Sequence, residues 1–313
     1  MPFVPKKQVC GSSIHAVKLG TGERACIIGG QNVLPFYTFD GPIDHPPVIG
    51  IELSDRCARW NVPGLREFYA GCETMADYAQ RAAVIPGAAF LALHFESADP
   101  SAENRSVESC VRDAEAVAAV TDLPLVILGC RNIQKDTELF AAVSEALQGR
   151  NLLVLSAREE NYKQVGAAAA LAYGQKIGAE TADDINLAKQ LNIMLKALPV
   201  DPGSIVMNIG TAAVGYGFEY VASTFDRVRL AALQQSDEDL QMPMIAPVSP
   251  DTWAVKESQA AGDEEPGWGP LEDRAVDMEI STAAACLAGG ADAVILRHPA
   301  AVAAIRQFIQ ELI

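Results

Sequence analysis

The amino-acid sequence predicts an α/β protein, a (β/α)8 TIM barrel with an N-terminal β-hairpin extension. Eight short apolar runs recur along the 313 residues, and an alanine-rich segment follows most of them. Strands that alternate with helices form a parallel sheet, and eight such units close a barrel. Only 6% of the residues are aromatic, which suits small side chains that pack helices around a sheet. The expected strands are Val48–Leu53, Phe90–Phe95, Leu123–Leu128, Leu152–Leu155, Lys176–Ala179, Ile205–Ile209, Met242–Ala246 and Ala293–Leu296.

The residues before the first of these strands do not share the repeat. We therefore divide the chain into an N-terminal extension, residues 1–45, and the barrel, residues 46–313. Within the extension, His15–Gly20 and Glu23–Ile28 read as two strands that flank a Thr-Gly turn. We expect this hairpin to cover the N-terminal mouth of the barrel.

Start and stop signals place helices between the strands. Thr181 with Asp184 resembles a capping box that opens a helix, and Pro199 ends that helix. Gly149 follows another helical segment directly. The expected helices are Leu65–Tyr69, Met75–Ala83, Ser106–Val120, Asp136–Gln148, Ile185–Leu198, Ser223–Gln234, Ala275–Leu287 and Pro299–Leu312.

One connection, Val248–Asp273 after the seventh strand, is much longer than the others. It contains Trp253 and Trp268 and acidic residues at positions 257, 263, 264, 265, 272 and 273. A solvated acidic insertion is one interpretation. The other is a docking surface for a partner protein around Trp268, because aromatic anchors dominate the energetics of interfaces.

Charge and cysteine content narrow the functional class. A net charge of −16 argues against nucleic acid or an anionic membrane as the main partner. Seven cysteines without a CxxC pair, and no signal peptide, predict a reduced, cytoplasmic protein. The apolar runs are too short for a membrane span. Since no four-cysteine array exists, no iron–sulfur cluster is expected on this chain.

Common catalytic constellations are poorly represented. His94 and His298 could both face the barrel mouth, but two histidines on strands far apart around the barrel make a poor metal site. Cys130 and Ser156 end strands without a base beside them in sequence. Lys176 begins its strand and so lies at the wrong end for a Schiff base. We expect no independent catalytic activity.

Polar residues nevertheless gather where strands end. We predict one hydrogen-bonded ring over the barrel, made of Glu52, Arg158, Glu180 and Asn208. A purely structural network is the alternative. A folate-type ligand also stays open, because pterin-binding barrels use Asp and Asn at such positions. Asp55, Glu96 and Arg297 are further charged residues at strand ends.

The loop after the sixth strand reads GTAAVGYG over residues 210–217. It has no lysine to engage phosphates, and the chain has no dinucleotide-binding fingerprint. Its glycines would let the backbone approach a ligand closely, or they serve an ordinary turn. With Asn208, Thr211 and Tyr216 nearby, this segment combines hydrogen-bonding side chains with flexible glycines, which makes it the best candidate for a binding site at the C-terminal face.

Several motifs together resemble one protein family. They are Gly29-Gly30-Gln31-Asn32, the segment Pro35–Gly41 (PFYTFDG), the strand that carries Glu52, the segment 172–192 and the 210–219 loop. Over nearly the whole chain the sequence resembles the small subunit of the corrinoid iron–sulfur protein. That subunit corresponds to the delta-type subunit of the CO dehydrogenase/acetyl-CoA synthase complex.

The resemblance implies a barrel that pairs as a heterodimer with a large subunit holding a [4Fe–4S] cluster and cobalamin. The heterodimer would carry a methyl group from methyltetrahydrofolate and its methyltransferase to acetyl-CoA synthase, in the reductive acetyl-CoA (Wood–Ljungdahl) pathway of anaerobes. This chain would shield and position the shared cobalamin without supplying a lower-axial histidine. Our own hypothesis for the residues that contact cobalamin is Ser156, Arg158, Glu180, Thr181, Asn208, Gly210, Thr211, Ala212, Gly215 and Tyr216.

Two rival functions stay open on the sequence. One is a methyltransferase that binds methyltetrahydrofolate on the same barrel, and it predicts folate binding by the isolated chain. The other is an assembly subunit that touches only proteins, through Trp268 and the acidic connection.

Overall fold

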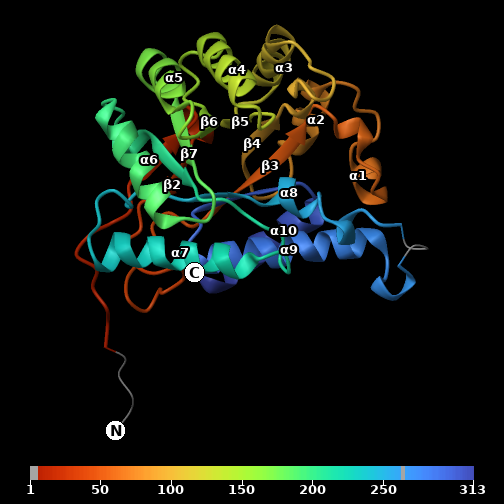
Figure 1. Ribbon diagram of the computed structural model, residues 1–313. Coiled ribbons are helices and arrows are strands. Elements are labelled where there is room, and N and C mark those ends of the chain that lie inside the picture. The colour runs from red at the N-terminus through yellow and green to blue at the C-terminus, as the bar shows by residue number, and fades with distance from the viewer. Residues whose placement is uncertain (1–5, 262–264) are drawn as a thin grey trace.

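The computed structural model describes residues 6–261 and 265–313, and it confirms the eight-stranded barrel (Figure 1). Every predicted strand is present, with bounds that differ by a few residues. Helices surround the strands on the outside of the barrel (Figure 1). The barrel strands are β3 (Val48–Ser54), β4 (Ala88–His94), β5 (Leu125–Leu128), β6 (Leu153–Ala157), β7 (Lys176–Glu180), β8 (Ile205–Asn208), β9 (Ile245–Pro247) and β10 (Ala293–Leu296).

The barrel strands are parallel, and their order closes on itself. Ladders join β8 through β7, β6, β5, β4, β3 and β10 to β9. A parallel bridge between Met207 and Met244, with a 2.8 Å hydrogen bond from the Met207 amide to the Pro243 carbonyl, joins the last pair. Gly50 in β3 makes room inside, since a Cβ there would lie 2.0 Å from the Phe90 ring.

The N-terminal hairpin covers the barrel mouth at which the strands begin, as the sequence predicted. Its strands are β1 (Ala16–Leu19) and β2 (Cys26–Gly29), joined through a 3-10 turn at 22–24. Val17, Leu19 and Ile28 pack against side chains inside the barrel. The Asn151 side chain, just before β6, donates to the carbonyls of Lys18 and Gly20 at 2.8 and 3.1 Å.

The predicted helices are present, and several begin earlier than expected. Phe218 rather than Ser223 opens α7, and Leu271 rather than Ala275 opens α9. A short helix and a π-helical turn (Gly166–Ala172) after β6 were not predicted. The helices are α1 (Pro63–Phe68), α2 (Met75–Ala82), α3 (Val107–Val120), α4 (Ile133–Ala146), α5 (Tyr162–Val165), α6 (Ile185–Ala197), α7 (Phe218–Gln234), α8 (Val248–Thr252), α9 (Leu271–Gly289) and α10 (Pro299–Leu312).

The predicted capping box at α6 is wrong. Asp184 itself is the N-cap, and its carboxylate accepts from the amides of Asn186 and Leu187 at 2.7 and 3.4 Å. A capping box needs the cap residue three positions before its acidic partner. Because Asp184 occupies the cap position, Thr181 stays outside the helix and is free to face the barrel mouth.

The long connection after β9 is partly helical, since α8 follows that strand at once. Trp253 is buried next to the core, whereas Trp268 is 39% exposed. The Lys256 ammonium and the Arg274 guanidinium lie 5.1 and 5.6 Å from the centre of the Trp268 ring. Two of the predicted acidic positions, Asp263 and Glu264, lie outside the described residues. Within the described segments, no helix combines the length and apolarity needed to cross a membrane.

Candidate functional site

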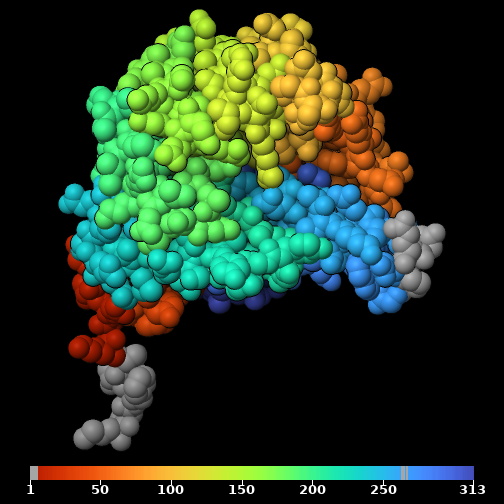
Figure 2. Space-filling view, in the orientation of Figure 1, coloured from red at the N-terminus to blue at the C-terminus, as the bar shows by residue number. Residues whose placement is uncertain are grey.

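A cavity of about 510 Å³ opens at the barrel mouth where the strands end. The ends of β4 to β9, the loops after β5 to β8, and residues of α4, α6 and α8 line it. Figure 2 shows the surface hollowed between the yellow-green segments that follow β5 and β6 and the blue segment that holds α8. The C-terminal ends of strands are where barrel enzymes and binding proteins place their sites.

Seven of the ten residues predicted to contact a cofactor line this cavity. Among them, Arg158 donates from Nε to Glu180 at 3.0 Å across the ends of β6 and β7. The Asn208 side chain accepts from the Gly210 amide at 3.2 Å and donates to Ser156 Oγ at 3.3 Å. The seven lining residues are Ser156, Arg158, Glu180, Thr181, Asn208, Gly210 and Thr211.

The remaining three predicted residues lie elsewhere on the loop after β8. Ala212 packs against the hydrophobic core. Gly215 has a positive φ of 93° and open space around it. The Tyr216 side chain is 49% exposed, and its hydroxyl donates to Glu257 at 2.6 Å in the connection after β9. None of the three is part of the cavity lining.

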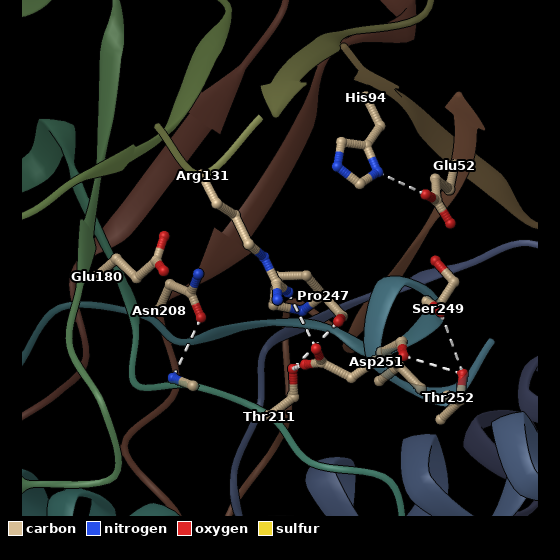
Figure 3. Close-up of polar contacts among 12 residues, drawn as sticks. Glu52, His94, Arg131, Glu180, Asn208, Thr211, Pro247, Ser249, Asp251 and Thr252 are labelled. Atoms are coloured by element: carbon tan, nitrogen blue, oxygen red, sulfur yellow. Dashed lines mark hydrogen bonds and ion pairs between the residues drawn. The ribbon is translucent and has the colours of Figure 1, made fainter. Parts of the chain in front are cut away.

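Arg131 and Asp251 are among the cavity residues that sequence reasoning missed (Figure 3). Arg131, in the loop after β5, donates to Asp251 of α8 at 3.0 Å. The same carboxylate accepts from the Thr211 hydroxyl at 2.6 Å, and that hydroxyl is also 3.1 Å from the Pro247 carbonyl oxygen. Together they link the loops after β5, β8 and β9 across the mouth. The only sequence signal was the position of Arg131, three residues after the end of β5.

The predicted single ring of Glu52, Arg158, Glu180 and Asn208 is wrong. Arg158 pairs with Glu180, but Glu52 lies in a separate network (Figure 3). Its carboxylate is fully buried and accepts from His94 Nδ1 at 2.8 Å and from Arg297 at 3.1 Å. The reason is the strand order: β3 neighbours β4 and β10, whereas β6, β7 and β8 lie further around the barrel.

Charge complementarity shifts the pKa values of this buried network. Burial by itself would raise the pKa of Glu52, but the guanidinium of Arg297 and the imidazole of His94 lower it to about 2. Burial would lower the pKa of His94, but the hydrogen bond and charge of Glu52 outweigh it and raise that pKa. The Arg297 guanidinium lies 4.8 and 5.4 Å from the rings of Trp60 and Trp253. A carboxylate paired with two cationic groups is the arrangement these shifts favour.

A second buried carboxyl group, Glu279 of α9, supports the end of β10. It accepts from the amides of Arg297 and His298 at 2.6 and 3.1 Å. Burial raises the pKa of Glu279 to about 7, although these amide hydrogen bonds act in the opposite direction. His298 does not reach the cavity; its Nε2 is 3.1 Å from Glu272, and its Nδ1 accepts from the Ala300 amide.

The environment of Cys130, just after β5, does not favour a nucleophilic thiolate. Burial, together with the nearby charge of Asp136, raises the pKa of Cys130 to about 12. The Cys130 thiol lies 3.3 Å from the Asp136 carboxylate, which also accepts from the Cys130 amide. A thiol must ionise to attack, so this raised pKa argues against Cys130 as a nucleophile. Across residues 6–261 and 265–313, no three His, Cys, Asp or Glu side chains are grouped to hold a metal ion.

The Thr181 hydroxyl is a polar group of the cavity with an unmet hydrogen-bonding capacity. It is buried, lines the cavity and has no hydrogen-bond partner among the described residues. Buried hydroxyls are nearly always paired in folded proteins. An acceptor or donor from a ligand in the cavity would therefore find a partner here.

These features define a (β/α)8 barrel with a wide polar cavity at its C-terminal mouth, and solved structures share the fold. Dihydropteroate synthase from Xanthomonas albilineans, bound to 4-aminobenzoic acid, matches with a TM-score of 0.55 and 15% identity, over 95% of this chain and 98% of that one. The Stenotrophomonas maltophilia enzyme matches with a TM-score of 0.53 and 17% identity over the same shares. At these identities the likeness concerns the fold alone.

The family is shown by sequence. Residues 16–305 match the model of the CO dehydrogenase/acetyl-CoA synthase delta subunit, and the chain belongs to this family. The acetyl-CoA decarbonylase/synthase complex subunit delta of Archaeoglobus fulgidus is 30% identical over 99% of this chain and 71% of its own length. The corresponding Methanothermobacter thermautotrophicus subunit is 32% identical over 97% of this chain and 77% of its own. The resemblance found in the motifs is thus confirmed.

Proposed function

We propose that this chain is the small subunit of a heterodimeric corrinoid iron–sulfur methyl carrier. The observation that carries the proposal is the family match over residues 16–305, together with relatives named as subunits of the acetyl-CoA decarbonylase/synthase complex. In this role the chain shields and positions a cobalamin held mainly by the large subunit. Its further partners are the methyltetrahydrofolate methyltransferase and acetyl-CoA synthase.

The cavity residues are chemically suited to a corrin ring. Corrins carry carboxamide side chains around their edge, and each carboxamide both donates and accepts hydrogen bonds. The mouth offers the unpaired Thr181 hydroxyl, the Arg158–Glu180 pair and the carboxamide of Asn208. The cavity volume of about 510 Å³ accommodates part of a corrin, which suits a cofactor shared between two subunits.

The chain's own residues would bind and exclude water. When bound, cobalamin would supply a cobalt centre that accepts and releases a methyl group. Thr181 and Arg158 would contact its carboxamides, while Gly210, whose φ is 90°, keeps the backbone at the mouth free of a side chain. A Cβ at Gly210 would lie 3.0 Å from the Asp183 carboxylate. The link between Arg131 and Asp251 holds the opposite wall and limits solvent access.

Size-exclusion chromatography with a cobalamin-loaded large subunit tests the proposal. Protein and corrin absorbance are followed together, and a one-to-one complex is the expected result. Thr181→Val removes the hydroxyl, which has no partner among the described residues, and keeps the shape of the side chain. The corrin carboxamide would lose this hydrogen bond, so we expect the substitution to weaken the complex by about tenfold. Thr21→Val, in the hairpin turn at the opposite mouth, is the matched control. Separate elution of the two wild-type chains would contradict the carrier role.

A second candidate is a methyltransferase that binds methyltetrahydrofolate on this barrel. The observation that favours it is the cavity itself, which has the volume of a small-molecule site and carries Asn208 with the carboxylates of Asp136, Asp183 and Asp251. Calorimetric titration of the isolated chain with methyltetrahydrofolate separates the two functions. Binding by the isolated chain, followed by methyl transfer to free cob(I)alamin, would support the methyltransferase and displace the carrier proposal.

A further inference from the structure

One ring nitrogen of His94 faces the cavity, and the other forms a hydrogen bond with the buried carboxylate of Glu52. It ends β4, is 8% exposed and lines the cavity. Nδ1 lies 2.8 Å from Glu52. Figure 3 shows the second nitrogen, Nε2, on the side of the ring turned away from Glu52 and toward Arg131. Within the described part of the chain, no hydrogen bond joins Nε2 to another residue.

The surroundings favour the doubly protonated form of this imidazole. Glu52 is fully buried and carries its charge because Arg297 donates to both carboxylate oxygens. A buried carboxylate with a hydrogen bond to Nδ1 raises the pKa of His94 above its usual range. An imidazolium has a proton on each nitrogen, and hence no free lone pair. In that form Nε2 faces the cavity as a hydrogen-bond donor and cannot ligate a metal ion.

Other cations at the mouth are already neutralised. Arg131 is paired with Asp251 at 3.0 Å, and Arg158 is paired with Glu180. With His94 protonated, the group of Arg297, Glu52 and His94 carries one net positive charge, and of the three side chains only His94 lines the cavity. Arg131 and Arg158 thus each have a carboxylate partner, whereas no described residue accepts a hydrogen bond from the cavity-facing nitrogen of His94.

We propose that His94 is a ligand-binding residue whose Nε2–H donates to a carbonyl oxygen of the molecule that occupies the cavity. The inference rests on the function proposed above, in which that oxygen belongs to a corrin carboxamide. Glu52 and Arg297 are positioning residues, because they fix the ring orientation and the charge of the donor. Hydrogen bonds from charged donors are stronger than those between neutral groups, so this contact is one of the strong ones in the cavity.

Two substitutions of His94 distinguish the hydrogen bond made by Nδ1 from the one made by Nε2. In His94→Asn the carboxamide nitrogen stands near Nδ1, so the bond to Glu52 is retained while the cavity-facing donor is lost. In His94→Gln the longer side chain places its nitrogen near Nε2, so the cavity-facing donor is retained. His15→Gln, on the hairpin at the opposite mouth, is the matched control. If His94 has only a structural role, His94→Asn should be tolerated and His94→Gln should be harmful. If His94 binds the ligand, affinity for the large subunit should fall in His94→Asn and be retained in His94→Gln.

The test measures the affinity of each variant for the large subunit, with and without cobalamin, from the tryptophan fluorescence of the complex. We expect His94→Asn to weaken binding of the cobalamin-loaded subunit by roughly 10- to 100-fold. Binding of the cofactor-free subunit should be unchanged, and His94→Gln should lie within a few-fold of wild type. In the free protein, ¹⁵N resonances should show both ring nitrogens of His94 protonated at pH 7.

Each alternative outcome has one meaning. Equal weakening with and without cobalamin, or an unchanged His94→Asn, overturns the role of His94 while the carrier function stands. A neutral His94 ring in the ¹⁵N spectrum overturns the donor assignment directly. If wild-type chain fails to bind the loaded subunit, the carrier function falls and the corrin acceptor assigned here falls with it.

Discussion

At the scale of single residues, burial decides what each charge does. The side chains of Glu52 and Arg297 are shielded from solvent, with exposed fractions of 0% and 10%, whereas those of Arg158 and Glu180 keep 28% and 26% of their surface. Removing one partner of a buried ion pair leaves an uncompensated charge in a medium that solvates it poorly. Partly exposed pairs are screened by water and contribute little to stability.

Arg297→Met should therefore destabilise the protein by about 3–5 kcal/mol, since Glu52 would keep only His94 as a cationic partner. Arg158→Met is the matched control, because it removes the same group from a partly exposed pair and should cost about 0–1 kcal/mol. Urea unfolding of both variants at pH 7 measures the difference. Similar losses in the two variants would contradict the assignment of Glu52 as a buried, paired carboxylate.

At the scale of elements, the two mouths of the barrel are built for different purposes. The hairpin β1–β2 closes the mouth where the strands begin, with Leu19 fully buried among side chains of the barrel interior. The opposite mouth remains open, and its loops carry the polar cavity. Apolar packing at one end thus leaves the other end available for a ligand.

Leu19→Ala should destabilise the protein by roughly 2–4 kcal/mol, because it removes buried methyl groups and leaves a void under the barrel. Lys18→Ala, on the exposed face of the same strand, should change stability by less than about 0.5 kcal/mol. Affinity for the cobalamin-loaded large subunit should be unchanged in folded Leu19→Ala protein. A loss of affinity with retained thermal stability would show that the hairpin, and not only the open mouth, contacts the partner.

At the scale of the whole molecule, charge sets the pH at which the fold is most stable. The chain has a net charge of −16 at pH 7, so self-repulsion grows as pH rises above its pI near 4.6. The pKa of Glu279 is raised by burial from 4.5 to about 7. The unfolded chain releases this proton first, so stability from Glu279 is complete below pH 4.5 and is lost as pH rises to about 7.

We expect the free energy of unfolding to be highest near pH 4.5. Above this pH the Glu279 contribution, about 3 kcal/mol, is lost progressively up to about pH 7, and the raised pKa of His94 acts in the same direction at higher pH. Below it, Glu52 has a pKa lowered to about 2, so its contribution is lost as pH falls from 4.5 toward that value. Urea unfolding from pH 4 to 8 measures the profile, and Glu279→Gln should flatten its decline between pH 5 and 7. A profile that rises steadily to pH 8 would refute this account.

The alternation of apolar runs and helical segments was sufficient to predict the barrel, its hairpin and the mouth at which polar residues gather. These are local properties: a strand ends where its apolar run ends, and the side chain that follows lies at the C-terminal mouth. Ser156, Arg158, Glu180, Thr181 and Asn208 were found in this way, and all line the cavity.

Only the tertiary structure decided which of those side chains meet. Glu52 was grouped with Arg158, yet it pairs with His94 and with Arg297, 245 residues away, because β3 lies between β4 and β10. Tyr216, in the loop after β8, was expected to contribute to the site. The loop instead leads away from the cavity, and the Tyr216 hydroxyl donates to Glu257. Strand order and loop direction arise from packing between distant segments, and spacing along the chain does not encode them. The sequence by itself thus determined the class of fold and the location of the site, whereas closure of the barrel determined its chemistry.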